Sequence, residues 1–532
     1  MNLDILPKTH AENLLTHTET DMWVDEAIWG HRLYDEQTPW LTMLEFLGIV
    51  QGELEADRAF IEERYNQLRY SSYTRLYLRN ILFNNPFLEE VNNQFSGDEE
   101  RWREWLRLMG ENCGGIDDPD FSYLRERFRS FDDFAKVVRF LQSNSIEGDS
   151  NKRWSSKFVF PYGVHCLYED LKVSNKDSYS NDRRFFARTG ELLYLMISRT
   201  GNKFNILEYL KKMGIVGEGN CSKWDKLVAT LQHDSENQPR DKNSNPPYLP
   251  YKQLDEFESL AKDWLNLLGC NLPGYDCLPH LVTITGLHLV IYLLKRAYAV
   301  LNNDDDSRFN SENLLDNGVI FILEIVGPKK TTVRNLSADN FACNTNITQQ
   351  AIEHYVRRLS RLPEWQSCYD YPDSRQRAVE IIQREIYYKG EDIKGNSPDE
   401  LLDEICQQAL IRHKQHMGKF HQAWLKEIGL ASNRGSRRNR YVPSDSLLKT
   451  LVLCCVPQRM EFQEFLQILS QKYGLIIGEK QAKEIIDRNE ADQEAFADNG
   501  ERLEQRLASL GLLKRLSDAC AYVLNPYAVE GN

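Results

Sequence analysis

The 532-residue sequence lacks the short motifs that identify the common catalytic folds. It has no Walker-type glycine loop, no Gly-x-Ser-x-Gly elbow, no His-Glu-x-x-His motif and no dinucleotide fingerprint. Enzymes that depend on one of these motifs are therefore excluded. A nucleophilic cysteine stays open, although no particular Cys stands out.

The sequence also lacks a disulfide framework, a signal peptide and a membrane-length apolar run. Its eleven cysteines are scattered singly, apart from the adjacent Cys454 and Cys455, which indicates reduced thiols and a cytoplasmic location. The first eight residues show no cationic region followed by an apolar run, so we expect no signal peptide. The longest apolar run, from Leu281 to Leu294, is shorter than the roughly 20 residues that cross a bilayer. We therefore predict a buried core helix there and no membrane partner.

Positive charge is scarce overall, because 65 Lys and Arg face 79 Asp and Glu, for a net charge of −14. Such a chain repels a polyanion on average. Any contact with nucleic acid must come from a local basic patch.

The content of 41% hydrophobic and 27% charged residues is typical of a globular protein of several domains. Helical apolar periodicity dominates, so we predict a mainly α fold with a small β element and a C-terminal winged helix. The predicted parts are a helical domain over 1–95, a second over 96–232, a linker over 233–249, a third, mainly helical domain over 250–410, a basic arm over 411–440 and a winged-helix domain over 441–532.

The winged-helix prediction comes from the order of elements after Tyr441. Pro443-Ser444-Asp445 is a helix start, and Gly474 ends a second apolar-striped helix in a left-handed turn. A third helix is predicted from Glu501 to Leu510, followed by a strand pair over 512–516 and 520–524. Three helices and a hairpin form a winged helix, a module that binds either DNA or proteins.

The best strand candidate outside this module runs from Gly318 to Val326, because most of its residues are β-branched or bulky. We predict that it pairs with a segment near residues 331–333. Ser337 is then predicted to cap the helix that follows.

A local excess of positive charge lies between Gln407 and Arg440, where eight Lys and Arg accompany a single acid, Glu427. Its last part mixes Gly and Ser with arginines, which suits a flexible arm that contacts phosphates. A basic interdomain linker held against acidic surface explains the pattern equally well. The candidate DNA-binding residues are Arg434, Arg437, Arg438, Arg440 and Lys426.

The winged helix itself is not basic, since residues 441–532 contain ten Lys and Arg against fourteen Asp and Glu. A recognition helix that approaches phosphates seldom has that balance. We therefore predict that this module contacts a partner protein.

Two further hypotheses place a metal ion on the chain, one as a nuclease and one as a zinc site. Asp316, Glu324 and Lys329 have the residue types of a metal-dependent nuclease, but the lysine lies beyond the strand that would have to carry it. A zinc site would draw on Cys270, Cys277, His280 and His288, but the six-residue gap between the cysteines is not a zinc knuckle. We expect no cofactor and no metal, while the nuclease stays an alternative.

Three segments resemble those of uncharacterised bacterial proteins from antiphage defence operons: 29–40, which begins Trp-Gly-His-Arg-Leu-Tyr, 185–195, which begins Phe-Phe-Ala-Arg-Thr-Gly, and 510–519, which begins Leu-Gly-Leu-Leu-Lys-Arg. The resemblance supplies no catalytic residues. It implies a companion subunit to an ATPase or nuclease encoded nearby.

Together these patterns favour a non-enzymatic, cytoplasmic subunit of a prokaryotic complex that acts on DNA, with a role in phage defence. The arm would contact the DNA backbone and the winged helix a partner protein. A structural scaffold that never meets nucleic acid is the third alternative.

Overall fold

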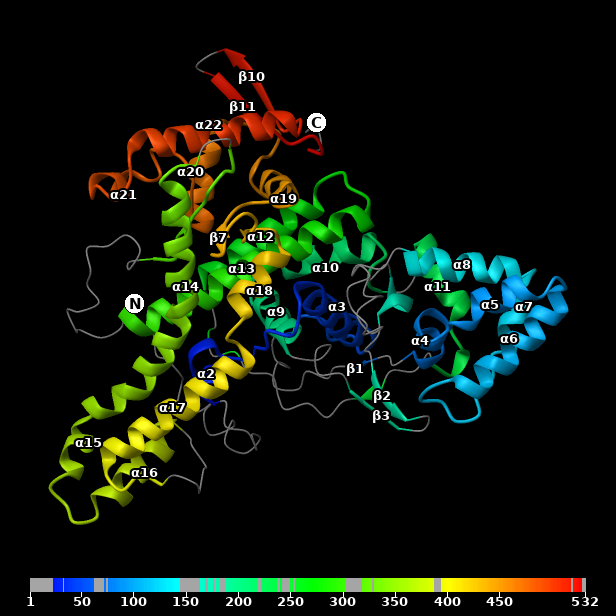
Figure 1. Ribbon diagram of the computed structural model, residues 1–532, viewed down its shortest axis with the longest axis horizontal. Coiled ribbons are helices and arrows are strands. Elements are labelled where there is room, and N and C mark those ends of the chain that lie inside the picture. The colour runs from blue at the N-terminus through cyan, green and yellow to red at the C-terminus, as the bar shows by residue number, and fades with distance from the viewer. Residues whose placement is uncertain are drawn as a thin grey trace. The chain divides into compact units, whose positions relative to one another are not determined.

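The computed structural model describes most of the chain as helical, with short strands in small sheets (Figure 1). The predicted mainly helical fold is therefore confirmed. The described residues are 23–31, 33–61, 71–72, 75–143, 163–167, 171–175, 178–181, 188–217, 222–236, 240–241, 249, 251, 254–302, 318–327, 330–386, 394–517 and 520–528.

The contacts between residues group the chain into two compact units. The main unit comprises Met1–Pro39, Arg199–Asn202 and Tyr248–Asn532, and the inserted unit comprises Trp40–Ser198 and Lys203–Pro247. The change of unit at Pro247 falls within the segment 233–249, where the sequence predicts a linker. The domain boundaries predicted from the sequence stay predictions.

The inserted unit is built from short amphipathic helices with a few two-stranded pieces. Its elements are α3 (Pro39–Glu55), β1 (Ser71–Ser72), α4 (Leu76–Phe83), α5 (Phe87–Gln94), α6 (Asp98–Asn112), α7 (Tyr123–Arg127), α8 (Phe131–Ser143), η3 (Val164–Cys166), β2 (Leu171–Asn175), β3 (Ser178–Asn181), α9 (Thr189–Ser198), α10 (Lys203–Lys212), α11 (Lys223–Leu231), η4 (Asp234–Glu236) and β4 (Arg240–Asp241).

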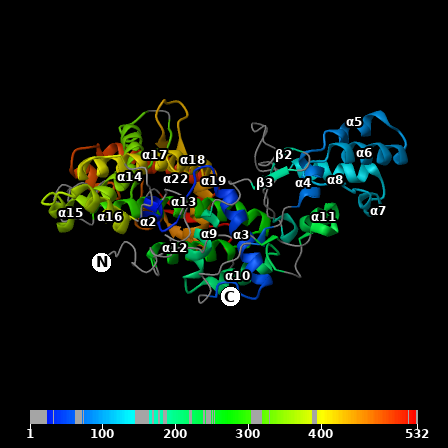
Figure 2. The same cartoon turned by 90° about the horizontal axis from the view of Figure 1, so that it is seen from below.

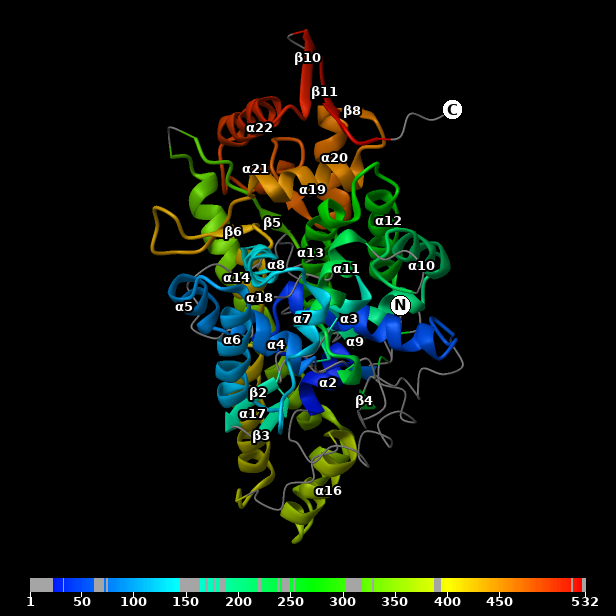
Figure 3. The same cartoon turned by 90° about the vertical axis from the view of Figure 1, so that its right-hand side faces the viewer.

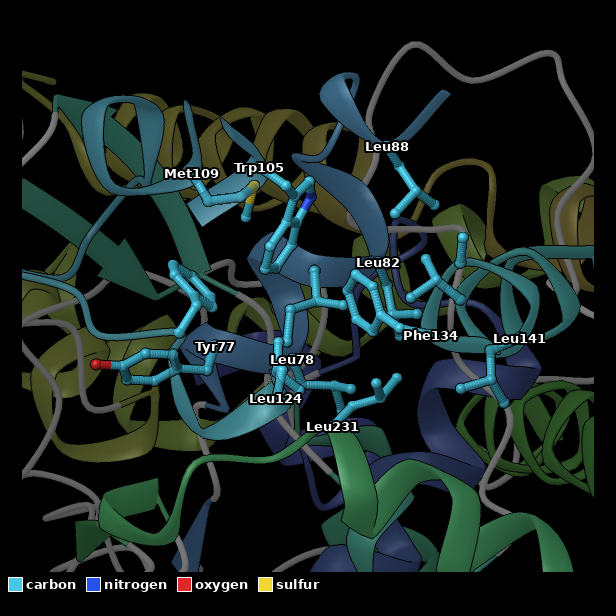
Figure 4. Close-up of a cluster of buried hydrophobic side chains, with 14 of the residues drawn as sticks. Tyr77, Leu78, Leu82, Leu88, Trp105, Met109, Leu124, Phe134, Leu141 and Leu231 are labelled. Carbon is cyan, nitrogen blue, oxygen red and sulfur yellow. The ribbon is translucent and has the colours of Figure 1, made fainter. Parts of the chain in front are cut away.

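One core of this unit is shown in Figure 4, where side chains from α4, α6, α7, α8 and α11 converge. Trp102 and Trp105 are buried on α6 and meet edge to face, with ring centroids 6.1 Å apart. The indole N–H of Trp105 donates to the side-chain oxygen of Asn85 at 2.9 Å, so the buried ring has its hydrogen-bond partner.

The main unit contains the longest helices and all of the candidate site residues. Its elements are α2 (Trp23–Trp29), α12 (Asp255–Leu268), α13 (Gly274–Asn302), β5 (Phe321–Ile322), α14 (Val333–Arg357), η5 (Arg358–Arg361), α15 (Pro363–Cys368), α16 (Ser374–Ile386), α17 (Pro398–His416), α18 (Phe420–Glu427), β6 (Ala431–Ser432), β7 (Arg440–Tyr441), α19 (Asp445–Cys455), β8 (Arg459–Glu461), α20 (Phe462–Tyr473), β9 (Leu475–Ile476), α21 (Lys483–Asp487), α22 (Gln493–Ser509), β10 (Leu513–Ser517) and β11 (Cys520–Leu524).

Helix α13 is the central helix of the main unit. By length and composition alone, its span Gly274–Leu301 could cross a membrane, but 94% of its most apolar window is buried within the protein. Two hydrogen bonds tie it to α2: Trp29 donates to the Leu293 carbonyl at 3.0 Å, and Tyr292 donates to the Trp29 carbonyl at 2.7 Å. The buried core helix predicted over Leu281 to Leu294 is therefore confirmed.

Helices α14 and α17 lie side by side in the views of Figures 1 and 2, and they are joined by polar side chains as well as apolar ones. His413 on α17 is fully buried, with Thr348 of α14 at 3.0 Å from Nε2 and Asp25 of α2 at 2.8 Å from Nδ1. The imidazole thus connects three helices.

The predicted strand over Gly318 to Val326 is only partly correct. The structure gives the two-residue strand β5, which pairs in parallel with β9, and Leu323 then forms a parallel bridge with Tyr441. Pairing with residues 331–333 is wrong, because helix α14 already begins at Val333. Ser337 is not a cap: it is buried inside α14 and accepts a hydrogen bond from the Tyr441 N–H at 2.9 Å.

The C-terminal elements follow the order α19, β8, α20, β9, α21, α22, β10 and β11 (Figure 3). Strands β10, β11 and β8 form one antiparallel sheet in that order. The Ser444 hydroxyl accepts from the Leu447 N–H, and Gly474 ends α20 with a φ of 69°, so the predicted start and stop are both confirmed. Helix α22, however, begins at Gln493, well before the predicted Glu501.

Candidate nucleic-acid interface

The end of the basic segment is a β-hairpin, which we call the basic hairpin, residues Ala431 to Tyr441. Its strands β6 and β7 pair antiparallel, with Ala431 opposite Tyr441 and Ser432 opposite Arg440. Gly435 lies in the loop with a φ of 69°, a left-handed conformation that glycine adopts without strain. Figure 3 shows this loop reaching outward beyond β6. The last part of the basic arm predicted over 411–440 is thus a loop between paired strands, while its earlier residues lie largely in α17 and α18.

The loop exposes three of the five candidate DNA-binding residues: Arg434, Arg437 and Arg438. Arg438 forms an exposed ion pair with Asp339 of α14. Lys426 is also exposed, on α18. These four side chains are accessible to a phosphate, and exposed pairs such as Arg438 with Asp339 exchange partners at little cost.

Arg440 differs from the other four because its side chain is only 3% exposed. Its guanidinium forms an ion pair with Glu324, whose side chain is 7% exposed. Arg440 also donates to the main-chain oxygen of Arg434 at 3.3 Å, and Arg334 of α14 lies 3.3 Å from the second oxygen of Glu324. Glu324 therefore holds two guanidinium groups, one of which fixes the base of the loop.

A second anchor of the hairpin is the buried phenol of Tyr441. Its hydroxyl accepts from Asn344 at 2.9 Å and lies 3.0 Å from Nε2 of His421. Thr345 gives its only hydroxyl proton to the Phe341 carbonyl, so it accepts from Nδ1 of His421 at 3.1 Å. Nε2 of His421 is consequently the acceptor for the phenol proton. Burial raises the pKa of Tyr441 well above its usual value and lowers that of His421 to about 3.

Two buried histidines, His421 at this anchor and His280 on α13, predict that the stability of the fold depends on pH. The pKa of His421 is about 3 and that of His280 about 4 in the folded chain, both lowered mainly by burial, against about 6.5 when unfolded. Below pH 6.5 the unfolded chain takes up protons that the folded chain refuses. The free energy of unfolding should then fall by up to about 1.4 kcal/mol per pH unit for each histidine. Urea unfolding at several pH values from 7.5 to 5 measures the slope of the free energy of unfolding against pH. This slope should be shallower in His421→Gln than in the wild type. An equal slope in the two proteins contradicts the lowered pKa of His421.

Helix α22, the predicted third helix, presents an acidic outer face. Glu494, Asp498 and Glu501 are exposed at helical spacing. Its two arginines are partly buried and lie near acids: the Arg502 side chain is 15% exposed, and the Arg506 side chain, 27% exposed, forms an ion pair with Asp445 at 2.7 Å. An acidic face repels the phosphate backbone, so α22 is a poor element for reading a DNA groove.

The residues of the nuclease hypothesis are only partly within the described chain. Asp316 and Lys329 lie outside the described residues. Both carboxylate oxygens of Glu324 face guanidinium groups, and a metal ion there would have to displace Arg334 or Arg440. Glu324 is thus placed to hold arginines.

The candidate zinc ligands are committed to other contacts. Burial raises the pKa of the Cys277 thiol to about 12, which opposes the thiolate that zinc requires. His280 pairs with Thr450 at 2.7 Å and His288 with Asp263 at 2.7 Å. Within the described parts of the chain, no group of three or more His, Cys, Asp and Glu is arranged to hold a metal.

The comparison with known proteins finds one family match, and the matched segment includes the basic hairpin. Residues 400–525 match the family model of the methylation-associated defense system protein MAD7. The segment that matches MAD7 starts within α17 and ends just after β11, so it contains the basic hairpin and the C-terminal elements. It confirms the resemblance to defence-operon proteins seen in the sequence. Searches among curated proteins and solved structures give no match.

Sequence reasoning named Glu324 as a nuclease candidate but missed its role as the partner of Arg440, and it missed the buried Asn499. Glu324 lies 116 residues before its partner Arg440. Asn499 of α22 is fully buried, accepts from the Ile325 N–H at 2.8 Å, and donates to the carbonyls of Leu323 and Ile477. For Glu324 the available signal was a charged residue inside the apolar run 319–326, which points to a buried polar partner; Asn499, between Asp498 and Gly500, gives no such signal.

Proposed function

We propose that the chain is a non-enzymatic, cytoplasmic subunit of a prokaryotic defence complex that associates with DNA. Residues 441–528 act in this proposal as a winged helix that docks a partner protein. The loop of the basic hairpin contacts the DNA backbone through Arg434, Arg437, Arg438 and Lys426. The partners are other subunits of the complex, including an ATPase or a nuclease.

The observation that carries the DNA contact is the anchored hairpin. Three exposed arginines lie on a short loop whose base is held by Arg440, Glu324 and Tyr441. Ordering the loop in advance lowers the entropy lost when it binds a phosphate. Arg440 then serves as the anchor of the loop, since it is buried.

The winged-helix assignment is supported by element order and charge. Helices α19, α20 and α22 come with a sheet of β10, β11 and β8, in which α20 contacts β8 and β11 and α22 contacts β10, with β10 and β11 as the wing. The acidic outer face of α22 and its two partly buried arginines favour contact with a protein over contact with phosphates. The MAD7 match, which names a defense system, supports the biological setting.

The DNA contact is tested by fluorescence anisotropy with a 20-base-pair duplex at several salt concentrations. Changing Arg434, Arg437 and Arg438 together to Ala should weaken binding and reduce the slope of log K against log salt by up to about 2.7, since each phosphate contact contributes about 0.9. A matched control changes the exposed Lys262, Lys480 and Lys483 to Ala, which removes the same charge elsewhere in the main unit.

The two variants separate the possible outcomes. A loss of slope in the arginine variant alone supports a phosphate contact at the hairpin. An equal loss in both variants means that binding follows net charge. No binding by the wild type overturns the DNA contact and leaves the chain as a protein scaffold.

A further inference from the structure

A pocket of about 580 Å³ lies in the main unit, at the base of the C-terminal elements. The starts of α13 and α19 form one side, and residues 510–512 and 526–527 form the other. Neither the hairpin nor the DNA contact uses it. Its lining combines apolar walls with a few polar groups, which is the composition of a ligand site.

The polar group deepest in this pocket is His280, which is 93% buried, with 7% of its surface exposed. Its Nδ1 lies 2.7 Å from the Thr450 hydroxyl. That hydroxyl donates its only proton to the Ser446 carbonyl at 2.9 Å, so Nδ1–H of His280 is the donor. Nε2 is therefore an unprotonated acceptor on a residue that lines the pocket, and no described residue donates to it.

Negative charge lies one helical turn away. Asp276 precedes His280 by four residues on α13, so both side chains lie on the same side of the helix. Asp276 is exposed, and no described residue donates to its carboxylate. Asp445 at the pocket edge is already paired with Arg506. The pocket thus offers two adjacent acceptors, one of them charged, to a ligand that donates.

The cation of the pocket, Lys449, is turned toward Tyr527. Its ammonium lies 5.0 Å from the ring centroid and 3.5 Å from the hydroxyl. An ammonium has three donors, so Lys449 still has protons for a neutral acceptor such as a main-chain carbonyl. The pocket therefore pairs an acceptor side, at Asp276 and His280, with a donor side, at Lys449.

The apolar lining and the volume of the pocket indicate what kind of ligand it can hold. Leu272, Pro279, Leu512 and Pro526 are apolar, and such walls suit the methylene stem of a long basic side chain. The volume exceeds what one side chain fills and suits a short peptide segment. A segment with a basic residue meets every requirement: its head group donates to Asp276 and His280, and its main chain accepts from Lys449.

We infer that this pocket binds a short segment of a partner protein through an arginine or lysine side chain. The inference deepens the partner-docking part of the proposed function and is independent of the DNA contact. The partner's basic residue lies between Asp276 and His280, and its stem packs on the apolar walls.

The test titrates the full chain with three capped tripeptides by NMR or calorimetry: acetyl-Gly-Arg-Gly-amide, its lysine counterpart, and a citrulline counterpart that keeps the shape of arginine without its charge. We expect the arginine or the lysine peptide to bind and the citrulline peptide to bind more weakly. Asp276→Asn should weaken the binding about fivefold through loss of a charge-assisted contact. Glu484→Gln, which neutralises an exposed acid on α21, should leave it unchanged.

Several results overturn the inference. Equal affinity for the citrulline and arginine peptides means that the pocket does not recognise the positive charge. Unchanged affinity in Asp276→Asn means that the peptide binds at another site. Binding of adenosine without binding of any peptide assigns the pocket to a small molecule. Because Asp276 is remote in sequence from the basic hairpin, Asp276→Asn should keep wild-type affinity for the DNA duplex, so the two proposals fail separately.

Discussion

Replacement of Asp263 with alanine is expected to lower the free energy of unfolding of the main unit by about 3–5 kcal/mol. Asp263 on α12 is fully buried and holds three side chains from two other helices. His288 of α13 donates to it at 2.7 Å, Tyr473 of α20 donates at 2.8 Å, and Lys472 forms an ion pair with it. Alanine would leave these groups without their acceptor inside the protein. The midpoint of urea unfolding, followed by circular dichroism, measures the loss.

The neighbouring residue supplies the control. Lys262 lies beside Asp263 on α12 but is exposed, so Lys262→Ala should change stability by no more than about 0.5 kcal/mol. Asp263→Asn keeps the shape of the side chain and one acceptor oxygen. Its loss of free energy of unfolding should therefore lie between those of Asp263→Ala and Lys262→Ala. Equal unfolding curves for Asp263→Ala and Lys262→Ala contradict the assigned role.

The same carboxylate should contribute to acid unfolding. Burial raises its pKa, but the hydrogen bond and charge of His288 and the charge of Lys472 outweigh burial, so the net pKa is lowered from 3.8. A lowered pKa gives stability that is present above the unfolded value of about 3.9 and is lost as the pH falls through the folded value. The stability gap between wild type and Asp263→Asn should therefore narrow below about pH 4.

The features that the sequence predicted well are local ones. Ser444 caps α19 and Gly474 ends α20 because each acts on groups within a few residues of itself. Such rules need no knowledge of the rest of the fold. The buried helix α13 was likewise predicted from the apolar run over Leu281 to Leu294, although the helix itself is longer than that run, and 94% of its most apolar window is buried.

What the sequence could not provide are pairs between distant segments. Asp263 precedes Lys472 by 209 residues, and Glu324 precedes Arg440 by 116 residues, so no spacing rule connects them. A count of charges treated Arg440 as equivalent to Arg434, Arg437 and Arg438. Burial separates it from them, and burial is a property of the packed chain.

Replacement of Glu324 with alanine is expected to cost about 3–5 kcal/mol as well, because Arg440 would keep its buried position without a counter-charge. Arg334 would lose the same partner. Urea unfolding measures the loss. The matched control is Asp339→Ala, which removes the exposed partner of Arg438 and should cost no more than about 1 kcal/mol.

A double variant distinguishes an anchor from a catalytic carboxylate. Glu324→Leu combined with Arg440→Met replaces the buried ion pair with apolar side chains of similar length, a change that is often neutral or stabilising. Stability should return to near the wild-type value, which Glu324→Ala alone cannot reach. If Glu324 instead held a catalytic metal, the double variant would fold and lose a metal-dependent cleavage of DNA that the wild type performs.

The double variant also decides what Arg440 does for the loop. If Arg440 is an anchor, it influences DNA binding only by positioning Arg434, Arg437 and Arg438. An apolar replacement that keeps the hairpin paired should then leave the slope of log K against log salt unchanged. As a phosphate contact, its loss should reduce the slope by about 0.9. An unchanged slope together with restored stability would assign Arg440 and Glu324 to the fold, and leave the contact with DNA to the three exposed arginines and Lys426.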